Sequence, residues 1–101
     1  MLTPEGKIKT RVKNMLDAQG IYYFMPLGSA WGRAGIPDIV ACLNGHFIGI
    51  EVKAGNKKPT ALQQRELEKI FRAGGTALCI NADTIDTLPS YLKNLKLYGL
   101  K

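Results

Sequence analysis

The stretch GIPDIVACLNGHFIGIEVK, residues 35–53, decides the fold because its two apolar runs are joined by Asn44-Gly45. An Asn-Gly pair between apolar runs is typical of a two-residue β-hairpin turn. With such a turn, counting outward along the ladder places Asp38 opposite Glu51. Directly opposed residues lie on one face of a sheet with their Cβ atoms roughly 5 Å apart. The sequence therefore predicts a hairpin that brings two carboxylates together.

Lys53 adds a positive charge to the same face, since it follows Glu51 by two residues along a strand. Two like charges about 5 Å apart repel by roughly 3 kcal/mol at an effective dielectric near 20, so the acidic pair needs a counterion. Hard cations such as Mg²⁺ take one or two carboxylates plus waters and substrate phosphates. The alternative is that Glu51 and Lys53 are solvated strand residues and that Asp38 caps a turn. The spacing of all three favours the metal site.

The composition indicates one basic globular domain, residues 1–101, with 46% hydrophobic residues. A formal net charge of +6 favours a polyanionic partner, most simply nucleic acid, although a basic protein without such a partner is the alternative. Cys42 and Cys79 lie in apolar strand-like runs, which predicts reduced, buried thiols in a cytoplasmic protein. The polar N-terminus and the lack of a run of about 20 apolar residues predict neither a signal peptide nor a membrane span.

One helix is expected before the hairpin in the sequence and another after it. Thr3 caps the first helix, which ends near Gly20, and Thr60 caps a second helix that runs to about Ala73. The apolar stripe of the first helix is expected to contain Ile8, Val12, Met15 and Leu16, and one face of the second Gln63, Leu67, Ile70 and Phe71. The other expected elements are strands over 21–25 and 76–81, the second parallel to its neighbour, and a helix over 83–97 interrupted near Pro89.

Each of the first two helices carries one polar side chain with two possible roles. Glu5 is either a first-turn acid favoured by the helix dipole or a carboxylate aimed at the acidic pair. Gln63 either returns a hydrogen bond to Thr60 in a capping box or turns its amide toward the same pair. The basic residues expected on the opposite, solvent side of the first helix are Lys7, Lys9, Arg11 and Lys13.

Candidate nucleic-acid contacts lie in two loops. In the loop over 26–35, Trp31 could stack on a base and Arg33 could contact a phosphate. The alternative is that Trp31 covers the core and Arg33 is solvated. In the loop over 54–59, Lys57 and Lys58 are either phosphate contacts or solvated charges. Apolar residues over 91–97 could pack on the sheet or on a partner subunit.

The order helix, strand, loop, hairpin, helix, strand, helix resembles the PD-(D/E)XK nuclease core. That core is an α/β, restriction-endonuclease-like fold with a central mixed β-sheet flanked by helices. The motif reads Pro37-Asp38 and Glu51-Val52-Lys53. Finer details resemble the compact stand-alone members of the VRR-NUC family found in phages and bacteria; these details are Gly35-Ile36-Pro37-Asp38-Ile39-Val40, Thr60 with Gln63, and Gly74-Gly75. The resemblance covers Glu5 to about Asn81.

This resemblance implies a role for each matching residue. Asp38 and Glu51 would bind Mg²⁺ or Mn²⁺ together with the backbone carbonyl of Val52. Lys53 would orient the attacking water and stabilise the negative charge that develops on the phosphate. Glu5 and Gln63 match the acid of the first helix and the glutamine of the helix after the motif, and complete the implied catalytic set.

The implied activity is metal-dependent, structure-selective hydrolysis of DNA phosphodiester bonds, similar to that of Holliday junction resolvases. The resemblance also implies a homodimer that acts on branched DNA in a bacterial or phage-infected cytoplasm, without a membrane or an organic cofactor. The alternatives are a non-catalytic nucleic-acid-binding domain, or a nuclease for linear duplex, flap or RNA substrates. The presence of Asp38, Glu51 and Lys53 together favours a hydrolase, because a pure binder has no use for opposed acids near phosphates.

Overall fold

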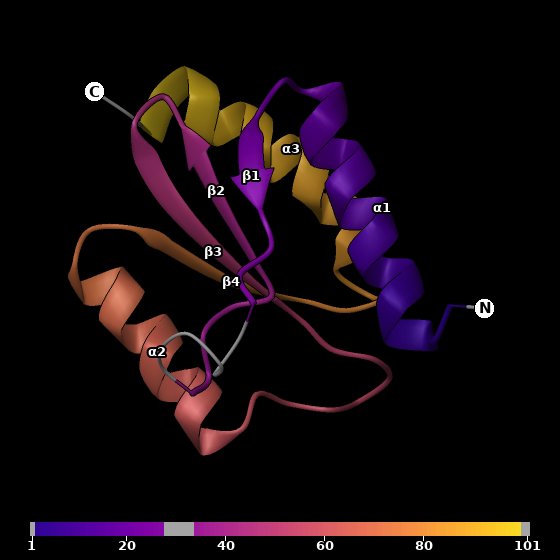
Figure 1. The fold of residues 1–101 in the computed structure, drawn as a ribbon. Coiled ribbons are helices and arrows are strands. Elements are labelled where there is room, and N and C mark those ends of the chain that lie inside the picture. The colour runs from indigo at the N-terminus through magenta and orange to yellow at the C-terminus, as the bar shows by residue number, and fades with distance from the viewer. Residues whose placement is uncertain (1, 28–33, 100–101) are drawn as a thin grey trace.

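A four-stranded mixed sheet forms the centre of the molecule (Figure 1), in the order β1-β2-β3-β4. The computed structural model describes residues 2–27 and 34–99. The first three strands pair antiparallel and β4 runs parallel to β3, so the predicted α/β class with a mixed sheet is confirmed. The strands are β1 (Tyr22–Phe24), β2 (Ile39–Leu43), β3 (His46–Val52) and β4 (Thr76–Ile80).

Helices cover both faces of this sheet, with α1 and α3 on one side and α2 on the other (Figure 1). The helices are α1 (Pro4–Ala18), α2 (Ala61–Arg72) and α3 (Leu88–Asn94), with a 3₁₀ turn η2 (Ile85–Thr87) before α3 and a π turn η3 (Leu95–Gly99) after it. The predicted caps are confirmed, because the side chain of Thr3 accepts a hydrogen bond from Gly6 and that of Thr60 accepts one from Gln63. The predicted break near Pro89 is confirmed, since the 3₁₀ turn ends at Thr87 and α3 begins at Leu88, with Pro89 in its first turn, where proline is tolerated.

The hairpin between β2 and β3 has the predicted two-residue turn. Asn44 and Gly45 both have positive φ, 52° and 84°, which matches the type I′ turn whose twist suits adjacent strands. The ladder runs from the pair Leu43–His46 to the pair Ile39–Ile50. The next pair in this register is Asp38 with Glu51, so the turn chemistry fixes where the two carboxylates meet.

The main core lies between the sheet and the α1/α3 layer. Alternate residues of β2 and β3 point into it, because side chains along a strand alternate between the two faces. Its fully or almost fully buried members include Ile39, Ala41 and Leu43 of β2 and Ile48, Ile50 and Val52 of β3, together with Ile8, Val12 and Leu16 of α1 and Leu88 and Leu92 of α3. The residues between them, including Glu51, therefore face the α2 side.

The α2 side of the sheet is only partly covered. Leu67 of α2 is buried, but Phe71, expected on the same face, is 72% exposed. Cys42 and Cys79 are also exposed, so their predicted burial is wrong. The single helix on this side, α2, has 12 residues and leaves part of this face open. Within the described residues, no helix is long and apolar enough to cross a membrane.

Candidate active site

Asp38 lies at the end of the hairpin, just before β2 begins. Its Oδ2 accepts a hydrogen bond of 2.8 Å from the backbone N–H of Val52, so the carboxylate closes the ladder beyond its last strand pair. Its other oxygen, Oδ1, lies 3.3 Å from Nζ of Lys9. The side chain is 21% exposed, which leaves it accessible to a ligand from solution.

Glu51 is the charged side chain that the fold buries most deeply among the described residues, with 2% of its surface exposed. Its Oε2 accepts a hydrogen bond of 2.8 Å from Nε2 of Gln63 and lies 3.7 Å from Nζ of Lys53. Its Oε1 is buried and finds no hydrogen-bond partner among the described residues. A buried carboxylate oxygen without a partner is costly, so this atom is suited to a cation.

The environment of Glu51 makes its negative charge unfavourable. Burial and then the nearby charge of Asp38 raise the pKa of Glu51 from 4.5 to about 7, although the charge of Lys53 acts in the opposite direction. The charge of Glu5 acts in the same direction as burial. Perturbed carboxylates of this kind are characteristic of functional sites.

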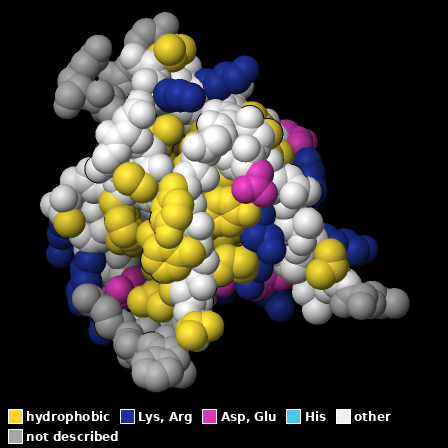
Figure 2. Space-filling model, turned by 45° about the horizontal axis from the view of Figure 1, so that its top comes forward, with side chains coloured by type: hydrophobic (Ala, Val, Ile, Leu, Met, Phe, Trp, Pro, Cys, Tyr) yellow, Lys and Arg dark blue, Asp and Glu magenta, His cyan; other side chains and the backbone are white. Residues whose placement is uncertain are grey.

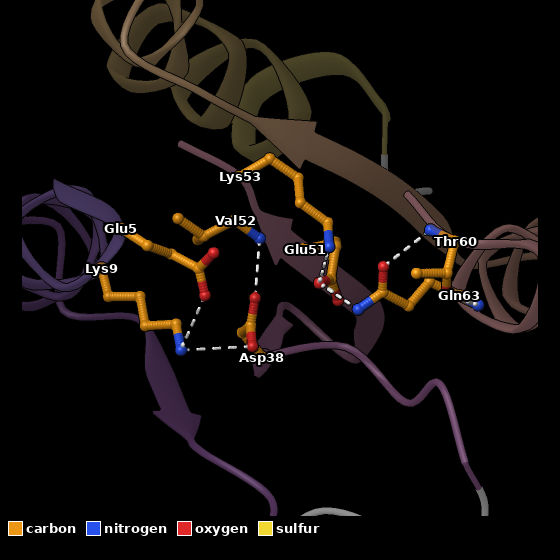
Figure 3. A network of polar contacts seen from close by, with 8 residues as sticks. All are labelled: Glu5, Lys9, Asp38, Glu51, Val52, Lys53, Thr60 and Gln63. Carbon is orange, nitrogen blue, oxygen red and sulfur yellow. Dashed lines mark hydrogen bonds and ion pairs between the residues drawn. The ribbon is translucent and has the colours of Figure 1, made fainter. Parts of the chain in front are cut away.

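Gln63 fulfils both of its predicted roles, because the two ends of its amide point in different directions (Figure 3). Its Oε1 accepts a hydrogen bond of 2.9 Å from the backbone N–H of Thr60, and its own backbone N–H donates to Thr60 Oγ1 at 3.2 Å, which completes the capping box. Its Nε2 donates to Glu51. The start of α2 is thus tied directly to the buried carboxylate.

Gly35 explains how α2 comes close enough for this contact. Its φ is +83°, and a Cβ atom built on it would lie 2.6 Å from the carbonyl carbon and oxygen of Leu62. Any other residue would therefore push the first turn of α2 away from the hairpin. The motif glycine has a packing function that the sequence pattern alone did not reveal.

Lys53 lies beside Glu51, as its spacing predicted. Its side chain is only 13% exposed, and Figure 3 shows its ammonium directed toward the Glu51 carboxylate. The 3.7 Å separation is that of an ion pair rather than a short hydrogen bond, so the ammonium can also approach a second anion. Hydrogen bonds and ion pairs thus link Asp38 to Val52 and Glu51 to Lys53 and Gln63.

Glu5 joins this group through a residue that the sequence analysis placed elsewhere. Lys9, expected on the solvent side of α1, lies 3.4 Å from Oε2 of Glu5 and 3.3 Å from Oδ1 of Asp38. Burial alone would lower the pKa of Lys9, but the charges and hydrogen bonds of Asp38 and Glu5 outweigh it and raise that pKa above 10.5. Placing Lys9 on the solvent side was therefore wrong. The available signal was its position four residues after an acid, where side chains on a helix meet.

Of the predicted nucleic-acid contacts, two lie in the part of the chain that the structure describes. Lys57 and Lys58 are exposed in the loop between β3 and α2. Trp31 and Arg33 lie outside the described residues. His46 lies beside the hairpin turn, with its Nε2 2.7 Å from Oγ1 of Thr76, and it takes no part in the site.

A groove of about 480 Å³ between α2 and the sheet contains none of the site carboxylates. It is lined by Pro37, Phe47, Glu66, Lys69, Ile70, Ala73 and Gly75, toward the other end of α2. The acidic group instead sits at the open end of the hairpin. An open position suits a polymer backbone better than an enclosed cavity does.

The donor set fits a divalent cation with few protein ligands. Within residues 2–27 and 34–99, no three side chains of His, Cys, Asp and Glu form a ready metal cage. Mg²⁺ does not need such a cage, since it commonly binds through one or two carboxylates and keeps several waters. A cation between Asp38 and Glu51 would give the buried Oε1 its missing partner and offset the repulsion that raises the pKa of Glu51.

The fold and this site together define a restriction-endonuclease-like nuclease domain of the VRR-NUC type. Residues 6–84 match the family model described as archaeal Holliday junction resolvase (Hjc). Because this match covers most of the chain, the protein belongs to that family. The matched segment includes the site residues Lys9, Asp38, Glu51, Lys53 and Gln63 but not Glu5.

Known proteins with similar structure or sequence agree with this assignment. A solved structure described as "VRR_NUC domain" aligns with a TM-score of 0.78 and 29% identity over 89% of this chain and 98% of that chain. A second, a "VRR_NUC domain protein", aligns with a TM-score of 0.69 and 23% identity over 95% of this chain and 90% of that chain, and shows the shared fold. The "Putative nuclease p44" of Acyrthosiphon pisum secondary endosymbiont phage 1 is 36% identical over 58 residues, which span 56% of this chain and 62% of that protein.

Proposed function

We propose that this protein is a Mg²⁺- or Mn²⁺-dependent endonuclease that hydrolyses phosphodiester bonds in DNA. The observation that carries the proposal is the buried Glu51, whose partnerless Oε1 adjoins Asp38 and an ammonium group. A purely structural carboxylate would have its oxygens satisfied by the protein. The unsatisfied atom is better explained by an ion and a substrate that bind there.

Asp38 and Glu51 would hold the metal ion, with the Val52 carbonyl as the predicted third protein ligand. When bound, such an ion polarises the phosphate and lowers the pKa of a coordinated water. Gln63 fixes the rotamer of Glu51 through its 2.8 Å hydrogen bond. Lys53, held nearby at 3.7 Å from Glu51, would orient the water and present positive charge where the transition state gains negative charge.

The substrate class follows from charge and from family. The net charge of +6 and the exposed Lys57 and Lys58 suit a phosphate backbone, which supplies most of the affinity of non-specific DNA binding. The family model is that of a Holliday junction resolvase, which favours branched DNA over linear duplex. Trp31 and Arg33 remain predicted contacts to a base and a phosphate.

A homodimer is the assembly that this proposal favours, and the uncovered part of the sheet supports it. Tyr22 pairs with Cys42, and Cys42 pairs with Phe47, so all three share the face that also carries Asp38 and Glu51. Tyr22 is 72% and Phe47 46% exposed. Figure 2 shows hydrophobic side chains gathered at the centre of one face of the molecule.

A second copy related by a two-fold axis would bury such a face against itself. Such an assembly would carry two acidic sites related by the two-fold axis, so that two strands of a junction could be cut together. Of the residues expected for this role, over 91–97, Leu92 is fully buried in the core and Leu95 packs against it. Tyr91 and Leu97 are exposed, so they stay a second candidate for the interface.

The direct test is a panel of labelled substrates with and without Mg²⁺ or Mn²⁺. It contains a four-way junction, a flap, linear duplex and RNA, and compares the wild type with Asp38→Ala. We expect metal-dependent, symmetric cleavage of the junction by the wild type alone. Binding without cleavage by a folded wild type would instead favour the non-catalytic nucleic-acid-binding domain.

A further inference from the structure

The polar group at the end of the hairpin has two places where a cation can sit. One is between Asp38 and Glu51, where Oε1 of Glu51 is partnerless. The other is between Asp38 and Glu5, where the ammonium of Lys9 already lies 3.3 Å from Asp38 and 3.4 Å from Glu5. Figure 3 shows Lys9 on one side of Asp38, and Glu51 with Lys53 on the other.

From this arrangement, and resting on the proposed metal-dependent function, we propose that Lys9 takes the place of a second divalent cation. The site then holds one metal ion per chain, between Asp38 and Glu51. Lys9 is a positioning residue in this scheme, because it acts on Asp38 and Glu5 and contacts neither the reacting water nor the metal.

The hydrogen-bonding capacity of Asp38 is consistent with one remaining place for a metal. An ionised carboxylate has about four lone-pair positions. In Asp38, Oδ2 accepts the Val52 N–H and Oδ1 faces Lys9. An ion shared with Glu51 can use a remaining lone pair, whereas an ion shared with Glu5 would have to displace the ammonium. That ammonium is held from both sides and has only 27% of its side chain exposed.

The formal charges of the site also favour one metal ion. The three carboxylates Glu5, Asp38 and Glu51 and the two ammonium groups Lys9 and Lys53 have a net charge of −1. One divalent cation and one phosphodiester bring this total to zero. A second divalent cation would leave a net charge of +2 in a half-buried site, which the field of the Lys9 ammonium opposes. Without Lys9, one ion and one phosphodiester leave a net charge of −1 and two ions leave +1, so the charges no longer favour a single ion.

The test is a titration of the metal-free protein with Mn²⁺, followed by calorimetry and by electron paramagnetic resonance of free and bound Mn²⁺. We expect one Mn²⁺ per chain for the wild type and for Lys9→Arg, which keeps the charge. For Lys9→Met we expect two, with about tenfold tighter binding of the first ion once the neighbouring charge is removed. Two ions about 3.5–4 Å apart also give a spin-coupled signal that a single ion cannot give.

Lys7→Met is the matched control, because it removes the same charge from an exposed position of α1 and should bind one ion like the wild type. Two ions bound to the wild type, or one ion bound to Lys9→Met with unchanged affinity, would overturn the role of Lys9 and leave the nuclease proposal intact. A folded wild type that binds no Mn²⁺ and cleaves no substrate would overturn both. If Lys9→Met does not fold, Lys9→Gln and the wild-type stoichiometry decide the question.

Discussion

Replacing Glu51 with glutamine removes the buried charge while keeping the shape of the side chain. In the metal-free wild type, the pKa of Glu51 is about 7 against an ordinary 4.5. Between these values the native state holds a proton that the unfolded chain has released. The free energy of unfolding therefore falls as the pH rises from about 4.5 to 7, and this loss is complete above pH 7. Glu51→Gln lacks this contribution to the pH dependence.

The magnitude follows from the shift in pKa. The difference between about 7 and 4.5 corresponds to at most about 3 kcal/mol. Water reaches the partly exposed Asp38 and Lys53 and screens the interaction, so we expect about half of this, roughly 1.5 kcal/mol. For a domain of this size, that is a difference of roughly 6–12 °C in Tm. As the pH rises from 5 to 8, the free energy of unfolding of Glu51→Gln should increase by this amount relative to that of the wild type.

The assay is urea unfolding followed by circular dichroism at pH 5 and pH 8, with a chelator present. Asp86→Asn is the control, since it makes the same chemical change at a carboxylate that is 78% exposed. Its difference from the wild type should stay within about 0.5 kcal/mol at both pH values. A difference between Glu51→Gln and the wild type that does not change with pH would refute the buried-charge argument. Added Mn²⁺ should stabilise the wild type and not Glu51→Gln.

Three further predictions test the geometry of the site and the assembly. Asp38→Asn keeps an oxygen for the Val52 N–H, so we expect its free energy of unfolding to change by less than about 1 kcal/mol while Mn²⁺ binding and cleavage are lost. Circular dichroism measures the folding of the variant, and loss of folding would contradict this expectation. Gly35→Ala should destabilise the protein by at least about 1 kcal/mol and weaken Mn²⁺ binding, because its Cβ would meet Leu62; wild-type values in denaturation and calorimetry would contradict it. Tyr22→Asp should convert a dimer into a monomer in analytical ultracentrifugation with its Tm nearly unchanged, and an unaltered dimer would rule out this face as the interface.

The sequence predicted most of the fold because its decisive signals are local. The turn at Asn44-Gly45 determined the register of the hairpin, and that register determined the meeting of Asp38 and Glu51. The two roles of Gln63 could not be separated by pattern, because both use the same residue of the same helix turn. The structure shows that they are compatible, since one end of the amide serves each.

Tertiary packing determines the two features that the sequence predicted wrongly, the position of Lys9 and the burial of the cysteines. Lys9 lies at the boundary of the buried stripe of α1, so helical periodicity alone could not assign it to the acidic group. Cys42 and Cys79 lie in apolar runs, but whether such runs are covered depends on how far one helix extends across the sheet. A pattern of residue types does not specify that extent.

The closeness of Asp38 and Glu51 along the chain has a consequence for how the protein folds. The two acids are 13 positions apart and joined by a tight turn, so a short loop closure brings them together, and short closures are fast. Gln63 and Lys9 reach them only after α2 and α1 have docked. Until then the like charges oppose each other in a half-formed hairpin. Refolding should accordingly be accelerated by millimolar Mg²⁺, and the acceleration should vanish once either acid is neutralised.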